Sequence, residues 1–158
     1  FEKSKHIKKI NKAYTDFEET QNNCYDRIIS IAVLEHLENL PWFLASSARK
    51  MKSEGYQSHS IPCEGYPTWN FSWSATRSLP FFLKSGLSYK KIQQHEHINN
   101  FDEILAIIKY FYNDVEVTYS YPFYFSPYLA LFANITFRSP NTNIIRKYLN
   151  LNKHISIK

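Results

Sequence analysis

One run of apolar residues constrains the fold more than any other part of the sequence. Residues 25–34, YDRIISIAVL, are nearly unbroken in apolar and β-branched side chains. Such runs are typical of a central parallel strand, because helices on both faces of a parallel sheet bury all the side chains of that strand. The sequence therefore predicts that Ile29, Ile31 and Val33 lie buried in the middle of a sheet.

The residues that follow this run continue an alternation of helix and strand. Residues 40–52 favour a helix with Pro41 in its first turn, and residues 56–61, YQSHSI, favour the next strand. A strand, a helix and a strand at this spacing form a βαβ unit, in which the crossover is right-handed and the strands are parallel. The first half of the chain is therefore predicted to have an α/β fold.

The second half of the chain is less regular. Residues 63–95 hold aromatic side chains and prolines without a clear period, and we interpret them as an insertion or lid over the sheet edge. Residues 100–112 favour an amphipathic helix that is capped by Asn100. Two further strands are predicted at residues 114–121 and 128–138, and they complete one domain over residues 1–138. A polar tail follows at residues 139–158.

The glycines of the chain bear on cofactor binding. The sequence has three of them, Gly55, Gly65 and Gly86, and each stands alone. A loop that wraps a phosphate or a nucleoside usually needs several glycines close together, because the backbone must approach the ligand. The sequence contains no loop of this kind.

Charge and cysteine usage limit the partners and the compartment. The net charge is +5, with much of the excess in a basic helix expected at residues 4–14 and in the tail. We favour solvated lysines over a nucleic-acid surface, which would need basic and aromatic residues interleaved on one face. Cys24 and Cys63 form no CxxC pair, and no apolar run approaches the ~20 residues of a membrane span. We therefore expect a cytoplasmic protein without a membrane partner.

Polar residues directly follow both predicted parallel strands. Glu35 and His36 come after the first strand, and Cys63 and Glu64 come after the second. In open parallel sheets ligands bind at the carboxyl ends of the strands, where a carboxylate and an imidazole can orient a substrate or take up a proton. The alternative is that Glu35 only caps the next helix and that His36 only packs.

Two further groups of side chains have competing interpretations. A metal site could combine His59 and Glu64 with residues 95–97, HEH, but the two histidines of that triplet point in opposite directions in an extended segment. Their spacing also fits no zinc pattern, so we expect no metal. The aromatic residues at 66–82 could stack on a planar substrate or a sugar, although a local hydrophobic lid is favoured.

Four segments of the chain are similar to motifs of one enzyme family. Residues 25–44, YDRIISIAVLEHLENLPWFL, follow the pattern fDxIxsxxvLEHl of a fourth strand and its helix, and residues 52–55, KSEG, follow the turn Lk-x-G-G. HSIPCEG at 59–65 and HEHINNFDEI at 95–104 follow the subgroup patterns xxIPsEG and xEHVNxxxEI. In this order and over roughly residues 14–138, the segments resemble class I S-adenosylmethionine-dependent methyltransferases.

The resemblance implies a fold and a reaction. The fold is a Rossmann-like sheet, mostly parallel with a C-terminal antiparallel strand, that is truncated at its N-terminus and lacks the first strand and its glycine-rich loop. The reaction is the transfer of a methyl group from S-adenosylmethionine to a small-molecule or carbohydrate-linked acceptor. The alternative is a non-catalytic remnant or binding module that keeps the fold but not the cofactor.

The resemblance also implies which residues contact the cofactor. Glu2 is the candidate for the acidic residue that holds the ribose hydroxyls, and Asp16 is the candidate for the contact to the adenine amine. The segment after the fourth strand lies beside the methionine part of the cofactor in this family. Leu34, Glu35 and His36 occupy that segment here.

Other positions are assigned to the acceptor and to catalysis. His36 or His97 is the candidate catalytic base, and catalysis is expected to depend mainly on positioning the donor and acceptor in line. The insertion at 63–95 is expected to shape the acceptor pocket. Glu64, Trp69 and Trp73 are its candidate substrate-binding residues.

Three expectations follow. Glu35, His36, Glu64 and His97 are predicted to converge on one cleft at the carboxyl ends of the strands. Because clustered glycines are missing, the chain is predicted to bind S-adenosylmethionine weakly or not at all. The exposed edge of its central strand also favours self-association.

Overall fold

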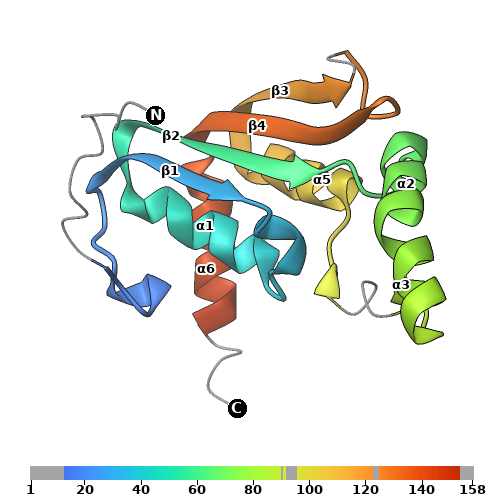
Figure 1. Ribbon diagram of the computed structural model, residues 1–158. Coiled ribbons are helices and arrows are strands. Elements are labelled where there is room, and N and C mark those ends of the chain that lie inside the picture. Colours follow the sequence, from blue (N-terminus) through green and yellow to red (C-terminus); the bar gives the residue numbers. More distant parts are fainter. Residues whose placement is uncertain (1–12, 90, 92–95, 123–124, 154–158) are drawn as a thin grey trace, which may run out of the picture.

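The computed structural model describes residues 13–89, 91, 96–122 and 125–153, so most of the helix expected at 4–14 lies outside the described residues. These residues form a four-stranded sheet in the order β1-β2-β4-β3 (Figure 1). The strands β1 and β2 are parallel, and β4 is antiparallel to both β2 and β3. The bounds are Tyr25–Ile31 for β1, Met51–Pro62 for β2, Tyr112–Pro122 for β3 and Ala130–Pro140 for β4.

The prediction of a mostly parallel, Rossmann-like sheet is wrong. One neighbouring pair, β1 with β2, is parallel, whereas β2 with β4 and β3 with β4 are antiparallel. The chain between β3 and β4 explains part of this result, because only residues 123–129 separate the two strands. A parallel connection needs a crossover of a dozen or more residues, whereas a short connection joins antiparallel neighbours.

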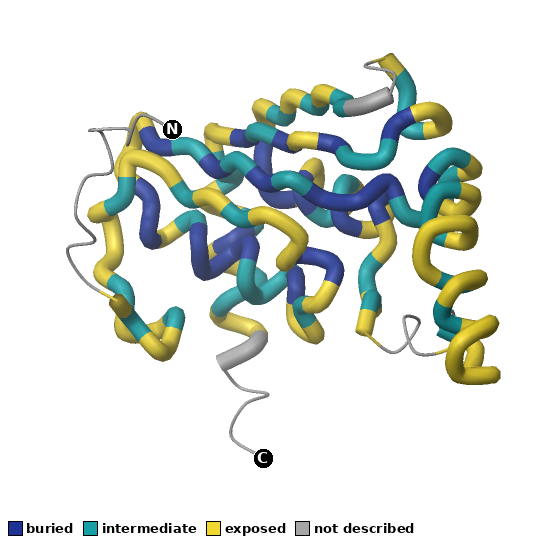
Figure 2. The backbone as a smooth tube through the Cα atoms, in the orientation of Figure 1, coloured by how far each residue is buried: buried dark blue, intermediate teal, exposed yellow. Residues whose placement is uncertain are grey.

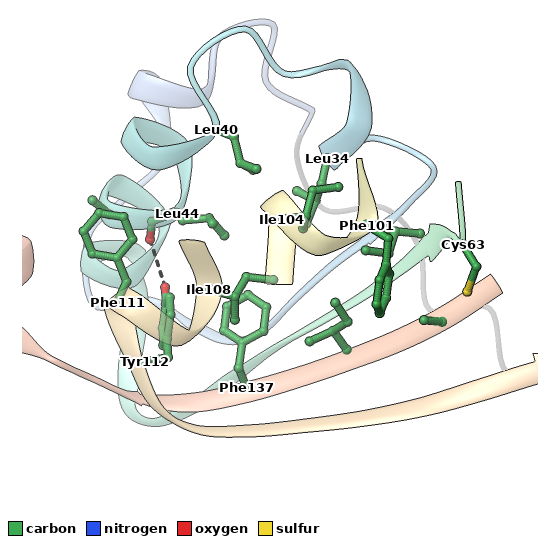
Figure 3. Close-up of a cluster of buried hydrophobic side chains, with 14 of the residues drawn as sticks. Leu34, Leu40, Leu44, Cys63, Phe101, Ile104, Ile108, Phe111, Tyr112 and Phe137 are labelled. Atoms are coloured by element: carbon green, nitrogen blue, oxygen red, sulfur yellow. Dashed lines mark hydrogen bonds between the residues drawn. The ribbon is translucent and has the colours of Figure 1, made fainter. Parts of the chain in front are cut away.

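Helices cover one face of the sheet. They are α1 (Leu40–Lys50), α5 (Phe101–Phe111) and α6 (Thr142–Lys153), and all three lie on the same side in Figure 1. The core between helices and sheet is continuous (Figure 3). Its fully buried members include Leu44 of α1, Ile108 of α5 and Ile135 and Phe137 of β4.

The predicted burial of the first strand on both faces is also wrong. Ile29 is 57% exposed, Ile31 71% and Val33 39%. Successive side chains of a strand point to opposite faces, and Ile28 packs against the core, so Ile29 and Ile31 lie on the other face. Figure 2 shows β1 as largely exposed, and the exposure of Ile29 and Ile31 shows that no described segment covers this apolar face.

The amphipathic helix expected at 100–112 is confirmed as α5. The Asn100 side chain accepts a hydrogen bond from the Glu103 backbone N–H, and the Glu103 carboxylate accepts one from the Asn100 backbone N–H. This reciprocal pair satisfies two backbone N–H donors at the helix start and fixes where α5 begins. The side chains that α5 buries are Phe101, Ile104, Ile108 and Phe111.

The segment expected as an irregular insertion contains helices. They follow one another without a break as α2 (Pro67–Trp73), the π-helical turn η3 (Ser74–Ser78) and α3 (Leu79–Ser85), and they stand beside the carboxyl end of β2 (Figure 1). The tail expected after residue 138 also packs on the body, since Ile145 of α6 is buried. Across the described ranges, every helix is too short or too polar to cross a lipid bilayer.

Candidate functional site

Four side chains from three separate segments meet at the carboxyl ends of β1 and β2. Glu35 and His36 belong to the short helix η2 (Leu34–His36) after β1, Glu64 follows β2, and His97 precedes α5. The Nδ1 atom of His97 lies 2.5 Å from Oε2 of Glu64, and the His36 and His97 rings meet edge to face with centroids 4.6 Å apart. These four residues lie at one edge of the sheet, as predicted, and the cleft that they were expected to line stays a prediction.

Hydrogen bonds hold η2 against the segment that precedes α5. The carbonyl of Glu35 accepts hydrogen bonds from the N–H groups of Ile98 and Asn99, at 3.0 and 3.1 Å. The Asn99 side chain donates to the carbonyls of Leu34 and Leu37, at 3.1 and 2.8 Å. Asn99 thereby links the segment before α5 to one carbonyl within η2 and one directly after it. Asn99 was not among the predicted site residues, and its only signal in the sequence was its place within the HEHINN segment.

The contacts of both histidines define their tautomers. Because a carbonyl oxygen can only accept, the 2.8 Å contact between His36 Nδ1 and the Glu96 carbonyl requires the proton on Nδ1. With an ionised Glu64 the same reasoning places a proton on Nδ1 of His97. In their neutral forms both imidazoles therefore have an unprotonated Nε2, which is the atom that can accept a proton from a ligand.

Glu35 is the most buried member of the group. Its side chain is 2% exposed, and its Oε2 atom has no hydrogen-bond partner among the described residues. Burial raises the pKa of this carboxyl, whereas the nearby His36 and His97 lower it and Glu64 raises it further. A buried carboxyl oxygen without a partner is costly, and a ligand that donates a hydrogen bond to it would remove that cost.

The residues assigned to the cofactor do not all lie near this group. Glu2 lies outside the described residues. The Asp16 side chain accepts a hydrogen bond from the Glu18 N–H at 2.9 Å and caps the short helix η1 (Phe17–Glu19), whose Phe17 packs on Trp42 of α1. Leu34 is fully buried in the core, so its side chain presents no surface to a ligand.

The two tryptophans of the insertion pack on one another. The Trp69 and Trp73 rings are stacked with centroids 5.2 Å apart, and Trp69 also meets Phe132 of β4 edge to face at 5.4 Å. The Trp73 Nε1 atom is buried without a hydrogen-bond partner in the described residues. The rings thus fasten α2 to the sheet, and their assignment to an acceptor stays a prediction.

His59, named in the metal alternative, belongs to the core. Its Nδ1 atom lies 2.6 Å from the Ser30 hydroxyl, its Nε2 atom lies 3.1 Å from Oε1 of Gln57, and its ring stacks on Phe137. Burial lowers the pKa of His59 to about 4, so it is neutral at physiological pH. Within the described ranges no group of three or more His, Cys, Asp or Glu side chains could hold a metal ion, and His95 lies outside them.

Comparison with known proteins adds no assignment. No protein-family model matches this chain. No curated protein matches it either. The methyltransferase interpretation therefore stays a prediction that rests on the four sequence segments.

Proposed function

We propose that this chain forms the acceptor side of a methyl-transfer site that uses S-adenosylmethionine and acts on a small-molecule or carbohydrate-linked acceptor. The observation that supports this most directly is the His97–Glu64 pair, which lies beside His36 where β1 and β2 end. Ligands of open α/β sheets bind at this edge. The proposal depends on this site and not on the overall sheet, whose strand pairing differs from the one the resemblance implied.

The structure suits the cofactor in part. Glu35 Oε2 is a buried acceptor without a partner in the described residues, and an ammonium group of the methionine part would satisfy it. Clustered glycines that would let the backbone approach the nucleoside are missing from the sequence. When bound, S-adenosylmethionine supplies an electrophilic methyl group. We expect the 158-residue chain alone to bind it weakly or not at all.

The chemical work that we assign to the chain is proton removal from the acceptor. The unprotonated Nε2 of His97 takes the proton of an acceptor hydroxyl or amine as that group becomes a nucleophile. Glu64 keeps the other proton of the ring on Nδ1 and stabilises the imidazolium that forms. His36 is held in the same tautomer by the Glu96 carbonyl and lies at the edge of the His97 ring.

The test is an assay of methyl transfer from labelled S-adenosylmethionine to panels of saccharides and small hydroxy compounds. The 158-residue chain is assayed, and so is any longer product that its gene encodes. We expect His97→Asn to lower kcat by about 10²–10⁴-fold, because general-base catalysis contributes on this scale. Glu64→Gln should lower kcat by about 10-fold or more. Glu54→Gln, at an exposed glutamate of β2, is the matched control and should leave kcat unchanged.

Two results would refute the proposal. One is full activity of His97→Asn and Glu64→Gln in a gene product that transfers methyl groups. The other is the absence of transfer by the complete gene product at saturating donor. The second result would favour a non-catalytic binding module, which the lack of clustered glycines already supports.

A further inference from the structure

The helical segment after β2 presents large apolar side chains to solvent. Phe71 is 77% exposed and Leu83 is 74% exposed, although side chains of this kind are usually buried. Figure 2 shows the segment as largely exposed along α2 and α3. We call the exposed apolar residues of this segment the 71–87 patch, which consists of Phe71, Leu79, Phe82, Leu83 and Leu87.

The patch is on the outer side of a helix whose inner side is already occupied. Trp69 and Trp73 pack toward the sheet through the contact between Trp69 and Phe132. Leu79, Phe82 and Leu83 are spaced at i, i+3 and i+4 in α3, so they share one side of that helix. The helix is therefore attached to the body without the patch, which remains available for a partner.

The charged side chains within the segment that carries the patch have one sign. Residues 65–91 contain no Asp or Glu. In the same range Arg77, Lys84 and Lys91 are exposed, and the Arg77 guanidinium carbon lies 6.0 Å from the centroid of the Trp73 ring. Aromatic and aliphatic side chains combined with basic residues, and without acidic ones, are the pattern of helices that lie in a membrane interface.

A hollow next to the patch is lined by apolar and by hydroxyl-bearing side chains. Its volume is about 350 Å³, and it lies beside Leu79 and Phe82. The remaining lining residues all carry hydroxyl groups, and they are Ser74, Ser78, Ser88 and Tyr89. Hydroxyls can donate hydrogen bonds to phosphate oxygens, so the hollow is suited to a lipid headgroup that lies next to inserted apolar side chains.

We propose that the 71–87 patch docks on the surface of an anionic lipid bilayer. The apolar side chains enter the boundary between headgroups and acyl chains, while Arg77, Lys84 and Lys91 contact the negative headgroups. This binding is peripheral and needs no helix that crosses the bilayer. The inference is independent of the proposed methyl transfer, because none of its residues belongs to the group around His97.

The experiment measures sedimentation of the 158-residue chain with vesicles of phosphatidylcholine and with vesicles in which about a quarter of the lipid is phosphatidylglycerol. We expect binding to the mixed vesicles that weakens as salt is added. Leu83→Ser should weaken it about tenfold or more through lost apolar burial, and Lys84→Gln about fivefold. The matched control is Ile31→Ser, at a side chain of β1 that is 71% exposed, which should bind like the wild type.

Several outcomes would overturn the proposal. They are no binding to either vesicle, equal binding to both vesicles, or equal binding by Leu83→Ser and the wild type. A parallel measurement of sedimentation velocity without lipid tests the patch as a contact between copies. Self-association that Leu83→Ser abolishes, together with no vesicle binding, would assign the patch to a second copy of the chain instead. Circular dichroism of each variant checks that the fold is retained.

Discussion

Replacing Ile135 with Ala and Ile31 with Ala compares two isoleucines on strands whose surroundings differ. Ile135 of β4 is fully buried, whereas Ile31 of β1 is 71% exposed. At about 0.8 kcal/mol per buried methylene, the truncation of a fully buried isoleucine removes roughly 2.4 kcal/mol of transfer free energy. The cavity left in the core adds to this, so we expect Ile135→Ala to lower the free energy of unfolding by about 2–5 kcal/mol.

The same truncation at Ile31 removes much less buried surface. Less than a third of that side chain is covered, which leaves a transfer term of about 0.7 kcal/mol. Urea unfolding followed by tryptophan fluorescence measures both changes, and the slope with urea should be equal for the two variants. A loss at Ile31 as large as the loss at Ile135 would show that β1 is covered on both faces, which would refute its assignment to an open face of the sheet.

Three further outcomes follow from the structure. Burial lowers the pKa of His59 from 6.5 to about 4, so the unfolded chain takes up a proton at a higher pH than the folded chain does, and the free energy of unfolding should fall by up to about 3 kcal/mol as the pH drops from 6.5 to 4. His59→Gln should lose this part of the pH dependence in urea titrations. An unchanged pH profile would contradict the burial of His59. Tyr112→Phe should lower the free energy of unfolding by about 1–2 kcal/mol in the same assay, since the Tyr112 hydroxyl donates to the Leu44 carbonyl at 2.9 Å (Figure 3). An unchanged free energy of unfolding would argue against that hydrogen bond. Gly55→Ala would place a Cβ atom 2.9 Å from the Tyr25 carbonyl oxygen, so we expect the free energy of unfolding, measured by thermal unfolding, to fall by about 1–3 kcal/mol. A stabilised variant would show that β1 and β2 separate easily.

Part of the candidate site could be predicted from the sequence. Glu35 and Glu64 directly follow the runs that form β1 and β2, and these two strands are parallel neighbours. The carboxyl ends of parallel neighbours lie at the same edge of a sheet, so residues after them meet whatever the rest of the sheet does. His97 was placed there by the resemblance of its segment. Asn99 could not be found in this way, because its role depends on which carbonyls face it in the folded chain.

The sequence by itself determined the features that depend on near neighbours along the chain. Asn100 and Glu103 form a reciprocal cap within one turn, so the start of α5 is local. The β-branched run around Ile29 and Ile31 likewise determined that a strand forms there. Both features are set by backbone geometry and side-chain shape over a few residues.

Only the tertiary structure decided how far that strand is buried. The same run suits a central strand covered on two faces and a strand with one face open, because the number of covering layers depends on segments far away in the sequence. In the described residues α1, α5 and α6 all lie on one face (Figure 1), and Ile31 of β1 is 71% exposed. The place of β4 between β2 and β3 is equally non-local, because its pairing with β2 joins segments far apart in the sequence. Local pattern specifies the element, whereas burial and strand order follow from contacts that only the folded chain brings together.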